Sequence, residues 1–118
     1  MKIEKAAEMG FCFGVRRAIE LVQKAALERG PLYTLGPLVH NQQVVDRLSE
    51  CGVEIAASLD EVQGNKVAIT SHGIGPDVMK LIKSRGLEVV DATCPFVRKA
   101  QIVAHRLGKE GIQVLVFG

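Results

Sequence analysis

The stretch Gly10-Phe11-Cys12-Phe13-Gly14-Val15-Arg16-Arg17 places one cysteine between two aromatic residues and two glycines. From Val15 onward the apolar residues recur with helical spacing, which predicts an amphipathic helix directly after the cysteine. A helix N-terminus presents unpaired N–H groups and a partial positive charge, and these stabilise a nearby thiolate. The thiolate is also the form of cysteine that binds metal. We therefore interpret Cys12 as a thiolate ligand held at a strand-to-helix turn.

The rest of the chain alternates short apolar segments with helical patterns. Helices are expected after Gly14, after a capping Asn41, and at two proline-initiated starts, Pro76 and Pro95. Ser58 is expected to cap one further helical turn. Strands are expected at residues 3–7, 32–35, 53–55, 66–70, 87–90 and 112–117. This alternation predicts the α/β fold class, built from βα units with a mainly parallel sheet.

Composition narrows the classes of function. The chain has 118 residues, 47% hydrophobic and 24% charged, which is ordinary for one globular domain. A formal charge of +2 does not indicate a nucleic-acid partner, and no apolar run is long enough to cross a membrane. The N-terminus resembles neither a signal nor a transit peptide, so we expect a cytoplasmic protein. Disulfides are then not expected among its three cysteines.

Four residues with ligand chemistry fall at turns that lead into helices. They are Cys12, His40, His72 and Cys94, one in each of four such turns. The carboxyl ends of parallel strands share one edge of a sheet, and ligands bind beyond that edge. Two thiolates and two imidazoles around one crevice fit a metal centre beside an anionic ligand, since helix N-termini also attract phosphate.

Each of these residues also has a simpler interpretation. A single cysteine is often an inert core residue, and a single histidine is usually a surface or hydrogen-bonded residue. Cys51 is expected at a helix end and His105 within the last helix, both away from the functional edge. Arg17 and its neighbour Arg16 could complement an anionic site or belong to a solvated helix face. No C-x-x-C, G-x-G-x-x-G, Walker or H-E-x-x-H motif is present.

Four successive motifs carry a family resemblance. They are Gly10-Phe11-Cys12-Phe13-Gly14-Val15, Leu35-Gly36-Pro37-Leu38-Val39-His40-Asn41, Ser71-His72-Gly73-Ile74 and Asp91-Ala92-Thr93-Cys94-Pro95. In order and spacing they resemble the motifs of the 4-hydroxy-3-methylbut-2-enyl diphosphate reductase family, along essentially all 118 residues. Members of this family catalyse the last step of the methylerythritol phosphate route to isoprenoids.

The resemblance implies an iron–sulfur enzyme with a 4Fe-4S cluster. Three cysteines of the family, one from each of three α/β lobes, hold the cluster, and its fourth iron binds the substrate hydroxyl. Two electrons and two protons then remove that hydroxyl as water, giving isopentenyl or dimethylallyl diphosphate. By motif, Cys12 and Cys94 resemble two cluster ligands, and His40 and His72 resemble two residues that grip the diphosphate. A ferredoxin or flavodoxin is the implied electron donor.

The resemblance also implies a division of the chain. Residues 1–13 would form a strand and cysteine turn that pack on a final lobe, and residues 14–94 the first lobe. Residues 95–118 would be the helix and strand that begin a second lobe. The third cysteine, a further histidine, the acidic proton donor and the later substrate contacts of the family have no counterpart here. We therefore expect that the chain is a fragment of a longer enzyme and is inactive alone. No catalytic acid is identified within it.

Two other classes of function stay open at this point. One is a small zinc- or phosphometabolite-binding α/β module, in which the same two cysteines and two histidines hold zinc or the helix starts hold a phosphorylated metabolite. The other is a plain α/β interaction domain whose cysteines are core residues.

Overall fold

The computed structural model describes residues 1–28 and 30–117. Its helices and strands alternate along the chain, which confirms the α/β class. In chain order the elements are α1 (Phe13–Glu28), β1 (Leu32–Leu35), α2 (Gln42–Glu50), β2 (Val53–Ala56), the 3₁₀ turn η1 (Leu59–Glu61), β3 (Lys66–Ile69), α3 (Pro76–Ser84), β4 (Glu88–Asp91) and α4 (Pro95–Lys109).

The four strands form one parallel sheet in the order β2-β1-β3-β4. From β1 the chain moves outward to β2, then returns to the other side of β1 and continues from β3 to β4. The direction of winding therefore reverses between β1 and β3. At such a switch point the loops after the two strands diverge and leave a crevice, which is where open parallel sheets bind their ligands.

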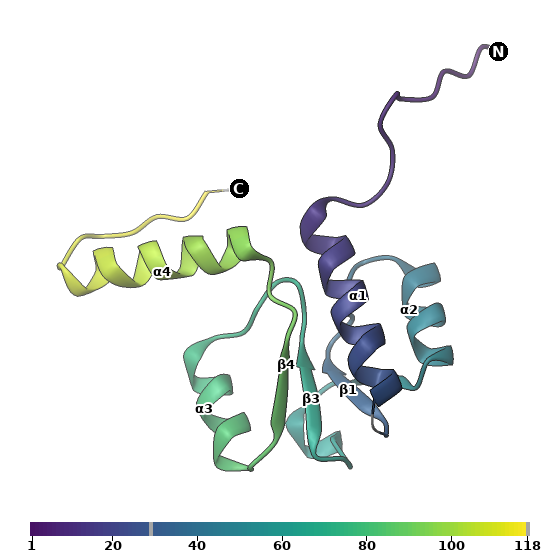
Figure 1. The fold of residues 1–118 in the computed structure, drawn as a ribbon. Coiled ribbons are helices and arrows are strands. Elements are labelled where there is room, and N and C mark those ends of the chain that lie inside the picture. The colour runs from purple at the N-terminus through teal and green to yellow at the C-terminus, as the bar shows by residue number, and fades with distance from the viewer. Residues whose placement is uncertain (29, 118) are drawn as a thin grey trace.

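Helices cover both faces of the sheet (Figure 1). On one face α1 and α2 bury an apolar cluster that includes Ala18, Val22 and Leu48 against the strands. On the other face α3 and η1 bury a smaller cluster around Val67 and Ile82. All four residues of β3 are buried, as expected for an inner strand with helices on both sides.

Most helix starts follow the local signals. The Asn41 side chain accepts a hydrogen bond from the Val44 N–H at 3.1 Å, and Pro76 and Pro95 occupy the first turns of α3 and α4. Ser58 precedes η1 but makes no capping hydrogen bond with its side chain, so the expected serine cap is wrong.

Two expected strands are absent from the described chain. Residues 3–7 and 112–117 pair with no strand, and the N-terminal segment extends away from the sheet (Figure 1). Their apolar side chains lie in solvent, with Ile3 76% and Val116 88% exposed. A strand is stable only when its backbone groups pair with a neighbour, and sequence pattern alone does not supply that neighbour. Nothing in the described chain buries any residue of α4, which precedes the second segment.

Candidate functional site at the carboxyl edge of the sheet

Two histidines flank the switch point of the sheet. His40 lies in the loop that follows β1, and His72 lies in the loop that follows β3. Their ring centroids are 5.1 Å apart with the planes tilted by 38°. Both side chains are exposed, so both imidazoles are accessible to a ligand at this edge. The structure thus brings together two residues that the sequence separates by more than thirty positions.

Cys94 lies at the start of α4, after β4. Its carbonyl accepts a hydrogen bond from the Arg98 N–H at 2.9 Å, which makes it the N-cap of the helix. Its own N–H donates to the carbonyl of Ser71 at 2.9 Å. The turn that carries Cys94 is therefore attached to the turn that carries His72. The predicted placement of Cys94 at a strand-to-helix turn is confirmed.

Cys12 lies directly before α1, and its carbonyl accepts from the Arg16 N–H at 3.1 Å. The helix start is as predicted, but no strand precedes it in the described chain, so the strand-to-helix turn is wrong for this residue. The side chain of Cys12 is exposed. With no strand to hold it, the position of Cys12 depends on how α1 packs.

Gly14 brings the first turn of α1 against Cys94. A methyl group built on Gly14 would lie 2.6 Å from the Cys94 Sγ, closer than such atoms approach one another, and 3.2 Å from its Cβ, which is a tight contact. The sulfur of Cys94 thus lies beside the N-terminal turn of α1 while its residue caps α4. Both helix N-termini favour a negatively charged ligand here. Cys12 therefore joins the same edge through α1 rather than through a strand of its own.

Ser71 joins three loops of the site and was not anticipated from the sequence. Its hydroxyl is buried and donates to the Leu38 carbonyl at 3.1 Å, in the loop that carries His40. Its carbonyl accepts from the Cys94 N–H. One buried residue beside His72 thus holds the turns after β1, β3 and β4 in a common arrangement. A small hydroxyl residue at the end of a buried strand was the available signal.

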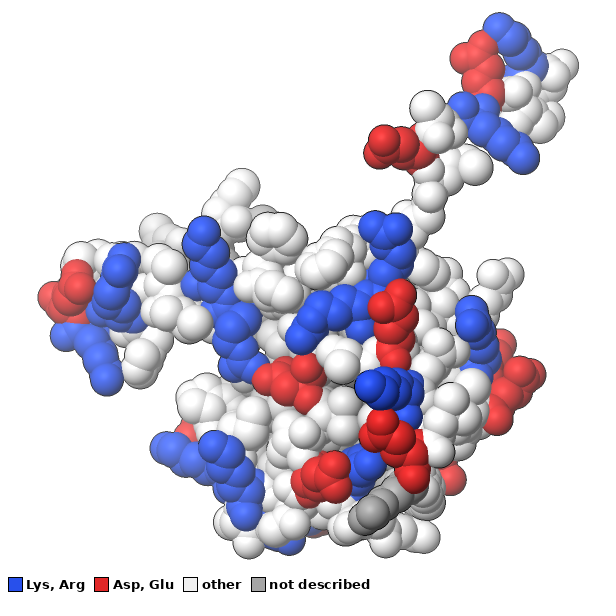
Figure 2. Space-filling view, viewed as in Figure 1, with Lys and Arg blue, Asp and Glu red and all other residues white. Residues whose placement is uncertain are grey.

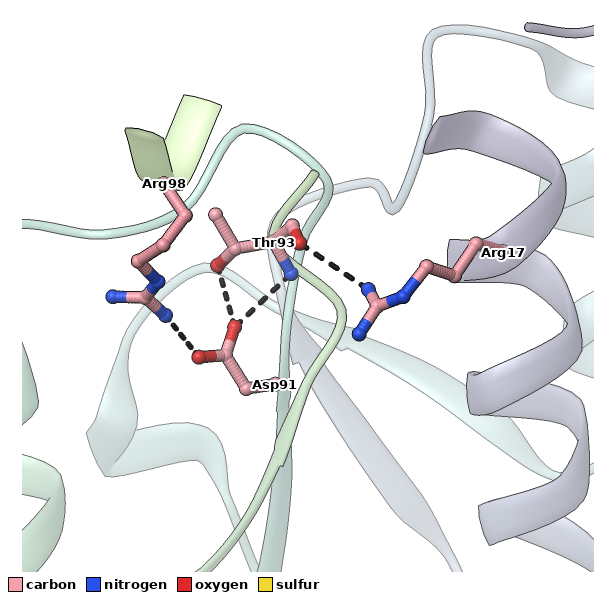
Figure 3. A network of polar contacts seen from close by, with 4 residues as sticks. All are labelled: Arg17, Asp91, Thr93 and Arg98. Carbon is pink, nitrogen blue, oxygen red and sulfur yellow. Dashed lines mark hydrogen bonds and ion pairs between the residues drawn. The ribbon is translucent and has the colours of Figure 1, made fainter. Parts of the chain in front are cut away.

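A polar network supports the turn before Cys94 (Figure 3). The Asp91 carboxylate accepts from the Thr93 N–H at 3.0 Å and from its hydroxyl at 2.5 Å, and it pairs with Arg98 on α4. From α1, Arg17 Nη1 donates to the Thr93 carbonyl at 3.3 Å. Arg17 thus contacts the site and does not belong only to a solvated helix face.

The same contacts keep Asp91 ionised. Partial burial of its carboxyl raises the pKa, but the hydrogen bonds from Thr93 and the positive charges of Arg98 and Arg17 outweigh that effect. The pKa of Asp91 is therefore lowered from its usual value of 3.8.

Cys51 lies at the helix end where it was expected, and His105 lies within the last helix as expected, but His105 is not separate from the functional edge because it shares a cleft with His72. Cys51 caps the C-terminal end of α2, and its N–H donates to the Leu48 carbonyl. His105 is exposed in the middle of α4. It lines an open cleft of about 650 Å³ between α4 and the start of α3, which His72 and Arg98 also border.

The described residues hold no complete metal site. Within residues 1–28 and 30–117, no three His, Cys, Asp or Glu side chains gather closely enough to bind an ion. All three cysteines are free thiols. Figure 2 shows basic and acidic side chains interleaved over the visible face, without a broad field of one sign. No described helix has both the length and the hydropathy needed to span a bilayer.

Comparisons with known proteins agree with this architecture. The model of the LytB protein family matches residues 3–118. A protein of Dehalococcoides mccartyi strain CBDB1, named 4-hydroxy-3-methylbut-2-enyl diphosphate reductase, is 53% identical over 118 residues, and a protein of the same name from Geobacter sulfurreducens is 45% identical. The match covers the whole of this chain and 42% of each relative.

Two solved structures share the fold. One is the (E)-4-hydroxy-3-methyl-but-2-enyl diphosphate reductase described as the terminal enzyme of the non-mevalonate pathway, with a TM-score of 0.77 and 43% identity. The other is the E-1-hydroxy-2-methyl-but-2-enyl-4-diphosphate reductase of Plasmodium falciparum, with a TM-score of 0.81 and 35% identity. Each match covers 86% of this chain, and 37% and 32% of the respective solved chains.

The fold and the site together define a class: a parallel α/β protein with thiols and imidazoles at the carboxyl edge of its sheet. Within that class, the chain belongs to the LytB protein family.

Proposed function

We propose that this chain forms part of an iron–sulfur reductase that removes the hydroxyl of 4-hydroxy-3-methylbut-2-enyl diphosphate to give isopentenyl and dimethylallyl diphosphate. The observation that carries the proposal is the meeting of the His40–His72 pair with the Cys94 turn, through Ser71, at one sheet edge. Relatives that carry the reductase name match the whole of this chain, which spans 42% of their length.

Cys12 and Cys94 would be two of the thiolate ligands of a 4Fe-4S cluster. The residues fit this group in part, because thiolates are its usual ligands and both cysteines stand at helix starts that Gly14 allows to meet. When bound, such a cluster would supply electrons and an iron that acts as a Lewis acid. A further thiolate would come from outside these 118 residues, so this chain alone is expected to be inactive.

His40 and His72 would bind the diphosphate. Their exposed rings stand 5.1 Å apart at the switch point, so one group with several phosphate oxygens can accept hydrogen bonds from both. The reaction consumes two electrons and two protons, and the hydroxyl leaves as water. The electrons would come from a small carrier such as ferredoxin or flavodoxin, and the enzyme would work in the cytoplasm. No side chain of this chain is assigned as the proton donor.

Cysteine variants of the complete natural protein test the cluster assignment. After anaerobic reconstitution with iron and sulfide, the parent and C51S should show broad sulfide-to-iron absorption, whereas C12S and C94S should lose most of it. Cys51 is the matched control because it is also partly accessible, but it lies at the C-terminal end of α2, whereas the loop of His40 leads into the N-terminal end of that helix. Equal absorption in all four proteins, or colourless stoichiometric zinc uptake in the parent, would contradict the assignment.

Histidine variants test the diphosphate site. H40N and H72N should each weaken the binding of inorganic pyrophosphate, measured by calorimetry, by about tenfold, since each loses a hydrogen bond to a charged group. H105N is the comparison variant, because His105 lines the cleft beside His72 but is not part of the His40–His72 pair, so its loss should weaken pyrophosphate binding less than either H40N or H72N. Unchanged affinity in both H40N and H72N would remove the histidines from the proposed site.

A further inference from the structure

We infer that Arg17 is a positioning residue for Cys94: it fastens the helix that follows Cys12 to the turn that precedes Cys94. The inference rests on the proposed function, in which the two thiols must reach one metal centre. It assigns a role to a side chain that contacts neither thiol.

The first step is the contact itself. Arg17 Nη1 donates to the Thr93 carbonyl at 3.3 Å, across 76 positions of sequence, and Figure 3 shows the Arg17 side chain reaching from α1 toward that oxygen. Thr93 is 5% exposed and is bonded directly to Cys94 along the backbone. A shift of Arg17 relative to Thr93 is therefore a shift of α1 relative to Cys94.

The second step is the face of the helix involved. Gly14 and Arg17 are three positions apart, so they lie on the same side of α1. Gly14 lets the helix approach the Cys94 sulfur, and Arg17 bonds to the residue before it. The contact at Gly14 sets how closely the two elements can approach, and the hydrogen bond from Arg17 holds them at that separation. Cys12, one residue before α1, moves with this helix.

The third step is that hydrogen bonds hold the far side of the contact, the turn of Thr93, independently of α1. Asp91 holds Thr93 through both its N–H and its hydroxyl, and Arg98 on α4 holds Asp91. Among the contacts of this network, only the one from Arg17 reaches α1 (Figure 3). Removing Asp91 or Arg98 would disturb the turn itself, whereas removing Arg17 leaves these contacts of the turn in place and deletes only the hydrogen bond that α1 makes to it, while the core packing of α1 remains. Arg17 is thus the position at which the relation between the two cysteines can be tested separately.

The experiment measures the separation of the two thiols in the complete natural protein without metal. The C51S background is treated with dibromobimane, which links two thiols that lie close together, and the Cys12–Cys94 cross-linked peptide is quantified by mass spectrometry. R17A should form this peptide about tenfold more slowly than the parent, because a hydrogen bond from a charged donor contributes about that factor. R17K keeps one donor and the charge, so it should recover part of the rate.

R16A is the matched control. Arg16 precedes Arg17 on the same helix and carries the same charge, and its side chain is exposed and donates no hydrogen bond within the described chain. R16A should cross-link at the parent rate, and far-UV circular dichroism should show the same helix content in all variants. The inference is overturned if R17A cross-links at the parent rate. It is also overturned if R16A is slowed as much as R17A, because the effect would then not be specific to Arg17.

The cross-linking rate separates a failure of this inference from a failure of the proposed function. The cross-link is formed without iron, so its rate reports on Arg17 even if C12S and C94S were to bind iron normally. Conversely, an unchanged rate in R17A would leave the cluster assignment standing while removing Arg17 from it.

Discussion

A side chain at position 14 would collide with the sulfur of Cys94. Alanine in place of glycine usually stabilises a helix by about 1 kcal/mol, whereas forcing a methyl group into a filled space costs about 1–3 kcal/mol. We therefore expect G14A to lower the free energy of unfolding by roughly 1 kcal/mol, measured by urea denaturation. The methyl group would meet Cys94 Sγ at 2.6 Å, so either α1 or the Cys94 side chain must shift.

Gly108 provides the control for this substitution. It also lies inside a helix, α4, but a methyl group there would meet no atom within 4 Å. G108A should keep or raise the free energy of unfolding, by up to about 1 kcal/mol. Stabilisation by G14A of the same size as by G108A would show that α1 does not need to approach Cys94.

Asp91 makes the stability of the fold depend on acid pH. Its pKa is lower in the folded chain than its usual value of 3.8, so its carboxylate stabilises the fold above that value, and the contribution is lost as pH falls through the folded pKa. D91N should therefore be less stable than the parent at neutral pH, and its unfolding free energy should fall less on acidification below about pH 4. Urea denaturation at a series of pH values measures both.

The control for Asp91 is D77N. The Asp77 side chain is 95% exposed on α3, so its loss should leave the acid dependence parallel to that of the parent. If the curve of D91N also runs parallel to the parent, the network around Thr93 does not stabilise the ionised carboxylate.

At the scale of elements, the start of α2 depends on one side chain. Asn41 accepts from the Val44 N–H and satisfies a backbone donor that the helix leaves unpaired, so N41A should cost about 1 kcal/mol of unfolding free energy. Ser58 occupies the equivalent position before η1 without a capping bond, and S58A should change the free energy by less than about 0.5 kcal/mol. Equal losses in chemical denaturation would contradict the difference between the two caps.

At the scale of the whole molecule, the protection of backbone amides against hydrogen exchange should differ between elements. The residues of β3 are all buried between two helical layers, whereas none of the residues of α4 is buried by the described chain. In the 118-residue chain, amide hydrogens of α4 should exchange at least about tenfold faster than those of β3, because local opening there exposes little apolar surface. Hydrogen exchange read by mass spectrometry measures this, with α1, which buries Ala18 and Val22, as the protected helix. Equal protection of α4 and β3 would contradict it.

Large apolar side chains on and beyond α4 are exposed in the described chain. Phe96 and Ile102 on α4 are 73% and 62% exposed, and Phe117 beyond it is fully exposed. The matched relatives are more than twice as long as this chain. We propose, as the sequence led us to expect, that residues 95–118 begin a second lobe and residues 1–13 pack on a final one.

Much of the fold was predictable because its signals are local. Helical spacing after Gly14, the prolines at two helix starts and the short buried strands each act within a few residues, and the structure has these elements close to the expected bounds. Strands at residues 3–7 and 112–117 failed because a strand also needs a partner, which no local pattern provides.

The residues of the candidate site also fall into those that the sequence could place and those that it could not. His40, His72 and Cys94 could be placed at one edge from sequence, since each follows a parallel strand. The roles of Ser71 and Arg17 could not, because their partners lie 33 and 76 positions away.

The sequence by itself therefore determined the α/β class, the helix starts and the edge at which cysteine and histidine residues collect. Only the tertiary structure decided that β1 and β3 are neighbours, which sets His40 beside His72, and that α1 meets the Cys94 turn through Gly14 and Arg17. The physical reason is that strand order and helix packing follow from the burial of side chains distant in sequence. Cys12 shows this most directly, because its place at the site depends on the packing of α1 and not on a strand of its own.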